Sequence, residues 1–314
     1  MMDQQAKIYV AGHQGMVGSA IVRRLQKAGH NNLLLKSRQE LDLLSQPAVA
    51  DFFAEAKPEY VFLAAAKVGG ILNNKNHKAD FIYQNLEIQN NIIYNAWRQG
   101  VKKLLFLGSS CIYPRDCPQP MKEEYLLSGK LEETNDAYAL AKIAGIKMCQ
   151  SFNQQYKTNF ISVMPTNLYG PHDYFDLVNA HVIPALIHKF HLAKINNQAK
   201  VELWGSGSSR REFLYVDDLA DACLYLMNNY NESEIINIGT GEDLAVKELT
   251  EKIKKAVGFL GEIAWSAVGP DGTPQKLLDV SKLSALGWKY QINLDDGLAL
   301  TYNWFTKNYD RIRK

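Results

Sequence analysis

The sequence is poor in cysteine and has no long apolar run, and these two absences exclude several classes of protein. Its four cysteines, at positions 111, 117, 149 and 223, form no CxxC pair and do not cluster with histidines, so no metal site is predicted. No apolar run approaches the ~20 residues that span a bilayer, and the N-terminus passes into a predicted strand without a secretory signal. We expect a cytoplasmic protein with reduced thiols and no membrane contact.

The sequence also has no large excess of positive or negative charge. The formal net charge is only +2, and no run of lysine and arginine reaches the length of a basic tail, so nucleic acid is not a predicted partner. Small molecules remain as the expected ligands. A chain of 314 residues is long for a single core, which predicts either a large domain with an appended lobe or two domains.

The first half of the chain alternates short apolar runs with amphipathic stretches. The apolar runs are too short for helices and predict buried strands at residues 7–11, 32–36, 60–66, 102–108 and 160–165. Between them, periodicity predicts helices at residues 17–28, 46–56, 81–99 and 137–155, the second begun by Ser45 as N-cap with Pro47 in its first turn. This alternation predicts an α/β fold of the Rossmann type, with a doubly wound parallel sheet.

The rhythm changes after Gly170. Helices are expected at residues 179–194, 216–228, 246–257 and 294–307, and short strands at 201–204, 234–238 and 262–265. We expect residues 1–170, with a returning segment at 214–240, to form a dinucleotide-binding domain. Residues 171–213 and 241–314 would then form a smaller α/β lobe that binds the substrate.

A glycine-rich segment, GHQGMVG at residues 12–18, follows the first predicted strand and precedes the first helix. In that context Gly12 permits a tight turn, Gly15 lets backbone amides approach a pyrophosphate, and Gly18 lets helix and strand pack closely. A purely structural turn is the alternative. The whole segment is the predicted cofactor loop, with His13, Gln14, Met16 and Val17 as its other members.

Arg38 decides which dinucleotide is expected. NAD enzymes usually place an acidic residue ~20 residues beyond the glycines, whereas an arginine suits the 2′-phosphate of NADP. Here the second strand leads to Arg38, and the acids Glu40 and Asp42 lie beyond it. NADP is therefore favoured, the alternative being that Arg38 is a solvated surface cation.

Tyr138 and Lys142 are four residues apart in a predicted helix, which places both side chains on one face. An adjacent ammonium stabilises a phenolate, so the pair can exchange a proton with a substrate oxygen. Ser109, after the fourth strand, could hydrogen-bond the same carbonyl oxygen while a nicotinamide delivers hydride to its carbon. An accidental surface pair is the alternative.

With GxxGxxG and a serine after the fourth strand, this YxxxK motif resembles the extended short-chain dehydrogenase/reductase family over nearly the whole chain. Longer stretches resemble one branch of that family: LAAAKVGGI, ADFIYQN, FLGSSCIYP, YALAKIAGIK, SVMPTNLYGPHD, HVIPAL, WGSGSSRREFLYVDD and PDGTPQKLLDV. Enzymes of this branch epimerise C3 and C5 of GDP-4-keto-6-deoxy-D-mannose and then reduce its C4 ketone with NADPH, giving GDP-L-fucose. The resemblance implies the same activity here, and a homodimer formed through helices 81–99 and 137–155.

The resemblance also implies roles for individual residues. Cys111 would be the base and His181 the acid of the epimerisation; without the resemblance, a core thiol and a helix cap are the simpler interpretations. Further cofactor contacts would come from the residues after the fourth and fifth strands, namely Leu107, Gly108, Ser109, Ser110, Pro165, Thr166, Asn167 and Leu168, together with Lys142 and His181. The GDP-sugar would contact Lys189, Trp204, Arg211 and Asp271.

Two departures from the family pattern stand out. Lys189 occupies a position that is often arginine, which loses a bidentate phosphate contact. Gln14 replaces an arginine often found in the glycine loop, which weakens the expected preference for NADP over NAD.

Three other functions are open alternatives. An NAD-dependent sugar 4-epimerase needs no cysteine and histidine pair, and a 4,6-dehydratase usually carries an acidic pair where this chain has Cys111, Ile112 and Tyr113. A non-catalytic NADP-sensing protein on the same fold would have little need for both Tyr138 and Lys142.

Overall fold

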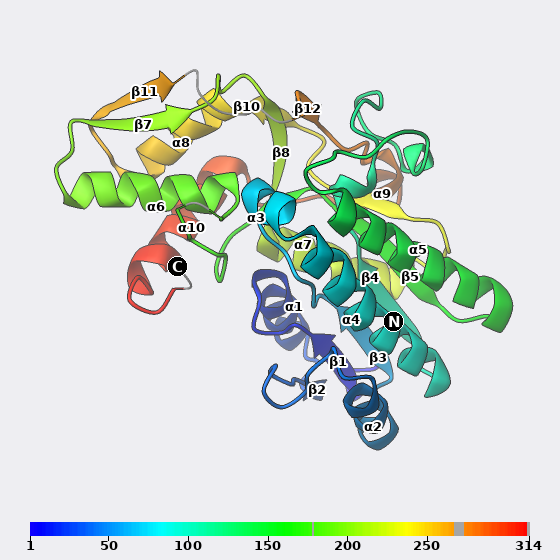
Figure 1. Cartoon of the computed structure of the whole chain (residues 1–314). Coiled ribbons are helices and arrows are strands. Elements are labelled where there is room, and N and C mark those ends of the chain that lie inside the picture. Colours follow the sequence, from blue (N-terminus) through cyan, green and yellow to red (C-terminus); the bar gives the residue numbers. More distant parts are fainter. Residues whose placement is uncertain (178, 267–272, 313–314) are drawn as a thin grey trace.

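A six-stranded parallel sheet forms the centre of the molecule (Figure 1). The computed structural model describes residues 1–177, 179–266 and 273–312. The strand order is β2-β1-β3-β4-β5-β9, and all the pairs are parallel. The strands are β1 (Ile8–Ala11), β2 (Leu33–Leu34), β3 (Tyr60–Leu63), β4 (Lys103–Leu107), β5 (Phe160–Pro165) and β9 (Ile236–Ile238).

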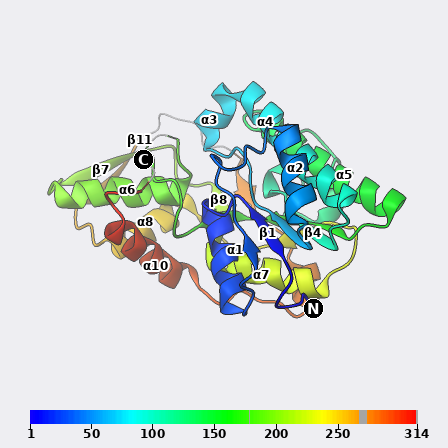
Figure 2. The same cartoon turned by 90° about the horizontal axis from the view of Figure 1, so that it is seen from below.

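Helices cover both faces of this sheet, as Figure 2 shows. On one face, α1 (Met16–Lys27) and α7 (Val216–Asn229) share an apolar core with alternate side chains of the strands. On the other, α2 (Gln46–Ala56), α4 (Lys78–Arg98) and α5 (Asp136–Tyr156) bury the opposite side chains. Because both faces are covered, the strands read as continuous apolar runs. The predicted doubly wound parallel sheet is confirmed.

Local sequence features predicted the bounds of several helices correctly. The Ser45 side chain accepts a hydrogen bond from the backbone N–H of Ala48 at 3.4 Å, and Pro47 lies in the first turn of α2. The predicted bounds of α2, α8 (Val246–Val257) and α10 (Leu294–Lys307) agree with the structure.

Other boundaries were wrong. The expected strand 32–36 is reduced to Leu33–Leu34 at the edge of the sheet, where only β1 pairs with it. The helix expected from residue 179 begins at Val182, because the carbonyl of Asn179 accepts a hydrogen bond from Gly70 instead of starting a helix. The short helices α3 (Ile71–Asn76) and α9 (Ser281–Ala285) were not expected.

A second sheet around β8 (Arg210–Tyr215) was also missed. It pairs β8 with β6 (Asn167–Tyr169), β10 (Asp243–Ala245) and β12 (Gln275–Lys276). Charged residues begin β8, so no apolar run marks it. This sheet joins the end of β5 to the C-terminal part of the chain.

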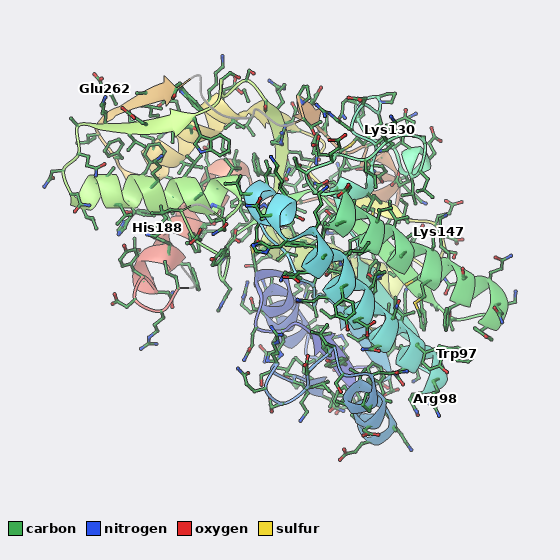
Figure 3. All side chains as sticks on the ribbon, in the orientation of Figure 1. Trp97, Arg98, Lys130, Lys147, His188 and Glu262 are labelled. Atoms are coloured by element: carbon green, nitrogen blue, oxygen red, sulfur yellow. The ribbon has the colours of Figure 1, made fainter. Side chains whose placement is uncertain are left out.

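The C-terminal part has its own core. Helices α6 (Val182–Ile195), α8 and α10 pack together beside the parallel pair β7 (Lys200–Trp204) and β11 (Glu262–Ser266). His188, on α6, faces this core (Figure 3): its Nδ1 lies 2.6 Å from the carbonyl of Phe175, and its ring lies against Phe305 of α10. In the part of the chain that the structure describes, no helix is both long and apolar enough to cross a membrane.

Candidate active site

The glycine loop lies at the carboxyl end of β1, where the strand order reverses between β1 and β3. Gly12 has a φ of +84°, and a Cβ there would lie 2.8 Å from the backbone nitrogen of Ala65. A Cβ on Gly18 would lie 2.1 Å from the carbonyl oxygen of Gly12. Gly15 is the N-cap of α1 and has no such crowding. The turn and the close packing therefore require glycine, and the N-terminus of α1 opens toward the crevice where such folds bind nucleotides.

The other predicted cofactor residues lie at the same edge of the sheet. Leu107 ends β4, Pro165 ends β5, and Thr166 and Asn167 follow, each donating a side-chain hydrogen bond to the carbonyl of Glu212. Gly108 and Ser110 follow β4, and Leu168 is the middle residue of β6. His13, Gln14, Met16 and Val17 lie in the glycine loop and the start of α1. Arg38 is exposed, four residues beyond β2.

Tyr138, Lys142 and Ser109 come together as predicted. Lys142 lies one turn after Tyr138 in α5, with its Nζ 5.8 Å from the centroid of the tyrosine ring. That ammonium donates to the carbonyl of Leu107 at 2.7 Å, which fixes it under the end of β4. The Ser109 hydroxyl forms a hydrogen bond with Tyr138. Helix α5 and strand β4 thus position all three groups.

Burial controls the protonation of this group. It raises the pKa of Tyr138 above its ordinary value; the nearby Cys111 raises it further, and the Ser109 hydrogen bond opposes both. Burial lowers the pKa of Lys142 to about 7, because the ammonium is desolvated. The lysine can therefore change protonation state in the neutral range, beside a phenol that stays protonated.

Cys111 lies in a short 3-10 turn (Ser110–Ile112) directly after β4, half-buried. Its backbone N–H donates to the Ser109 hydroxyl at 3.2 Å, which links it to the tyrosine group. Its Sγ accepts a hydrogen bond from Asn135 Nδ2 at 3.3 Å and faces the Nζ of Lys276 at 3.9 Å. The sulfur therefore has an amide donor and an ammonium as neighbours.

Arg211 belongs to the same surroundings. It is paired in register with Lys276 across β8 and β12. Burial lowers the pKa of Arg211, and the neighbouring Cys111 partly offsets this. Cys111 also lines a small cavity with Ser110, Tyr113, Gln119, Gln275 and Lys276 among its walls. The cysteine thus faces two cations and a cavity.

His181 is the N-cap residue of α6, and its side chain makes no capping hydrogen bond. The preceding Asn179 and Ala180 pack against Gly70, where a Cβ would lie 2.7 Å from the Asn179 oxygen. The His181 side chain is exposed at the surface. Desolvation by the surrounding protein, together with the charge of Lys276, lowers the pKa of His181. Lys276 is thus close to both Cys111 and His181.

The predicted substrate residues are more dispersed. Lys189 donates from Nζ to the carbonyl of Glu202 at 2.5 Å, and burial lowers its pKa. Trp204 ends β7 with 55% of its surface exposed, so it is not a core tryptophan. Asp271 lies outside the described residues.

Sequence reasoning did not single out Asn135 or Lys276. Lys276 lies in the family-like stretch PDGTPQKLLDV and Asn135 lies three residues before Tyr138, but neither has a local pattern that points to Cys111. Among the described residues, no group of three or more histidine, cysteine or acidic side chains is placed to hold a metal ion.

Fold and site together define a dinucleotide-dependent enzyme of the short-chain dehydrogenase/reductase type. Residues 8–239 match the model of the NAD dependent epimerase/dehydratase family. The chain is 58% identical over 308 residues, 98% of this chain and 94% of the relative, to a putative GDP-L-fucose synthase 2 of Arabidopsis thaliana.

Two solved structures extend the likeness. A GDP-L-fucose synthetase from Naegleria fowleri bound to NADP has a TM-score of 0.93 at 30% identity, covering 100% of this chain and 98% of the other. A GDP-mannoheptose C4 reductase from Campylobacter jejuni with NADP bound has a TM-score of 0.90 at 47% identity, covering 98% and 100%. The chain belongs to the NAD dependent epimerase/dehydratase family and, within it, to the family of GDP-L-fucose synthases.

Proposed function

We propose that this protein converts GDP-4-keto-6-deoxy-D-mannose to GDP-L-fucose, by epimerisation at C3 and C5 followed by reduction of the C4 ketone with NADPH. The observation that carries the proposal is the position of Cys111. Its backbone is hydrogen-bonded to Ser109 of the reducing group, and its sulfur faces Asn135 and Lys276. A reductase alone has no need of a thiol beside the reacting carbonyl.

The epimerisation half uses Cys111 and His181. Protons at C3 and C5 are acidic because each lies next to the C4 ketone, whose oxygen takes up the electrons as an enolate. The Cys111 thiolate removes the proton from carbon, and the His181 imidazolium returns a proton to the opposite face, which inverts the centre. The lowered pKa of His181 makes its imidazolium a stronger acid. Solvent then restores both groups.

The reduction half uses Tyr138, Lys142 and Ser109. NADPH supplies a hydride to C4 when bound, and Tyr138 protonates the resulting alkoxide. Ser109 lies beside Tyr138 and would bind the same carbonyl oxygen. Lys142 beneath the tyrosine ring stabilises the phenolate that remains.

The cofactor would lie on the N-terminus of α1 and along the ends of β4 and β5, with Arg38 at the 2′-phosphate. The uncrowded Gly15 at the N-cap of α1 fits a pyrophosphate. The diphosphate of the GDP-sugar would bind Arg211 and Lys189, with Trp204 packing on the sugar or the base. Asp271 is a further proposed contact.

A homodimer through α4 and α5 is part of the proposal, as is a cytoplasmic location. The support for the dimer is a set of large apolar side chains exposed on these two helices: Tyr83, Tyr94, Leu140 and Tyr156. Trp97 stacks on Tyr156 at 4.3 Å between ring centroids, near the far end of α4 in Figure 3. Such rings are typical of interface cores.

The dehydratase alternative has less support. The position of its acidic pair is taken by Cys111 and Ile112, and the next residue, Tyr113, is buried with its hydroxyl 2.6 Å from Asn237. The likeness to a GDP-mannoheptose C4 reductase supplies a second candidate substrate class, the GDP-4-keto-heptoses. Comparing kcat/KM for the two ketones decides between them.

Incubation with GDP-4-keto-6-deoxy-D-mannose and NADPH in deuterated water tests the proposal. NADPH should be oxidised, and mass and NMR spectra should show deuterium at C3 and C5 of the product. If NADPH is oxidised but the product carries no deuterium at C3 and C5, the protein is a C4 reductase without epimerase activity. If NADPH is not oxidised, the proposed function is wrong. Replacing NADPH by NADH measures the cofactor preference.

A further inference from the structure

Glu212, in the middle of β8, is a fully buried carboxylate that the proposed chemistry does not use. Its exposed fraction is 0%. Burial raises its pKa, and hydrogen bonds from the backbone of Leu278 and Gly241 oppose that shift. A buried acid is costly unless its oxygens are fully hydrogen-bonded. The contacts of Glu212 therefore show what it holds in place.

The two carboxylate oxygens bind two separate segments of chain. Oε1 accepts hydrogen bonds from the backbone N–H groups of Thr240 at 2.6 Å and Gly241 at 2.8 Å, in the turn after β9. Oε2 accepts from the backbone N–H of Leu278 at 2.9 Å, just beyond β12. A Cβ on Gly239 would lie 2.1 Å from Oε1, so the turn is closed tightly around the acid. The carboxylate is a bridge between the central sheet and β12.

Strand β12 depends on this bridge because it is so short. It consists of Gln275 and Lys276, each paired with one residue of β8. Leu278 follows two residues after Lys276, so the hydrogen bond to Oε2 fixes the strand just past its end. On its other side, Leu277 is held by Met121 and Gln119. Without Oε2, the segment would lose its hydrogen bond to β8 beyond the strand. It would keep the strand pairing, the hydrogen bond from the Gln275 side chain to Asp243 at 2.6 Å and the one from the Asn237 side chain to the carbonyl of Asp279 at 3.1 Å.

The position of Lys276 is what this anchoring controls. Its Nζ lies 3.9 Å from Cys111 Sγ, and its backbone is in register with Arg211, the residue directly before Glu212. We infer that Glu212 is a positioning residue for proton transfer, which holds β12 against β8 so that Lys276 stays beside the Cys111 thiolate. The inference rests on the proposed function in that it assumes Cys111 transfers protons.

Glu212→Gln is the discriminating variant, because the substitution preserves volume. Both carboxylate oxygens accept from backbone N–H groups, so in either orientation the new amide NH₂ faces a donor. The backbone carbonyl that binds Thr166 and Asn167 on the cofactor side is unchanged. We expect deuterium uptake at C3 and C5 to fall about tenfold, while the Kd for NADPH changes less than twofold.

Alkylation of Cys111 by iodoacetamide provides a readout that does not depend on turnover. In a Cys117→Ser background the remaining cysteines, Cys149 and Cys223, are fully buried, so labelling reports Cys111. A displaced Lys276 stabilises the thiolate less, and we expect alkylation at pH 7 to slow about threefold. Lys276→Gln in the same background should slow it at least as much.

Glu248→Gln is the matched control. Glu248 also accepts a backbone hydrogen bond, from Ala245 at 3.0 Å at the start of α8, but on the exposed side of the lobe. The Glu248→Gln variant should be less stable than the parent. The rate of Cys111 alkylation and the rate of deuterium exchange per folded molecule should not change. If Glu212→Gln behaves like this control, the inference is wrong.

A second variant, Glu212→Asp, tests the inference if Glu212→Gln does not fold. Glu212→Asp keeps the charge but is one methylene shorter, so it cannot reach both segments, and we expect slower alkylation of Cys111 with it as well. Unchanged alkylation in Glu212→Asp would overturn the inference. Failure of the proposed function has a different signature: Cys111→Ser would then exchange C3 and C5 at the parent rate, whatever the Glu212 variants do to alkylation.

Discussion

The group around Tyr138 and the group around Cys111 are neighbours in one site, but they are assembled differently. Tyr138 and Lys142 share one helix, and Lys142 is fixed to the end of the adjacent strand through Leu107. Cys111 instead receives Asn135 from the start of α5 and Lys276 from a two-residue strand 165 positions away. One group is local to the central sheet, and the other exists only where several segments meet.

This difference separates the two halves of the proposed reaction physically. A group on one long helix keeps its geometry when distant contacts change, because α5 packs along its length against α4 and the central sheet. A group gathered from several segments depends on the contacts that position each of them, such as those of Glu212. Variants in the two groups should therefore affect reduction and proton exchange separately.

Tyr138→Phe should have the largest effect. Removing the hydroxyl eliminates the proton donor for the C4 alkoxide, and we expect reduction to fall roughly a thousandfold. Deuterium uptake at C3 and C5 should continue within a few-fold of the parent rate, since Cys111 and His181 are unchanged. NADPH oxidation followed by absorbance and label followed by NMR measure the two halves.

Tyr230→Phe is the control for this change. The substitution removes the hydrogen bond from the Tyr230 hydroxyl to the carbonyl of Glu234 at 3.0 Å and the hydrogen bond with Lys282. Both rates should remain as in the parent. If Tyr138→Phe stopped exchange and reduction equally, the two groups would act as one unit and the comparison would fail.

Cys111→Ser should have the next largest effect, on the other half. A hydroxyl is a much weaker base than a thiolate at neutral pH, so exchange at C3 and C5 should fall roughly a hundredfold. The affinity for NADPH should not change. Cys117→Ser, in the neighbouring loop, is the control and should leave exchange intact. Equal loss of exchange and cofactor affinity would mean that Cys111 only shapes the pocket.

The sequence predicted the group around Tyr138, and the fold that supports it, almost completely. The parallel sheet, the bounds of α2, α8 and α10, the turn at Gly12 and the shared face of Tyr138 and Lys142 all follow from spacing within short segments. Periodicity and capping act over a few residues, so one sequence is enough to recognise them.

The group around Cys111 was only partly predictable. Cys111 and His181 were named through resemblance, whereas Asn135 and Lys276 were missed, because nothing local to either residue marks a partner in another segment. Strand β8 was missed for a related reason: Arg210, Arg211 and Glu212 interrupt any apolar pattern, and Glu212 is buried only because distant backbone amides satisfy it. Long-range hydrogen bonding overrode the local polarity.

Lys276→Gln should produce a smaller effect on the same half as Cys111. The substitution removes the ammonium 3.9 Å from Cys111 Sγ, while Arg211, in register beside it, still provides a positive charge. We therefore expect exchange to fall about tenfold, less than in Cys111→Ser. Lys276→Arg should recover part of the rate, since it restores the charge with a different shape. The rate of reduction should fall only because less epimerised ketone is formed. If Lys276→Gln instead weakened NADPH binding and left exchange unchanged, Lys276 would belong with the cofactor rather than with Cys111.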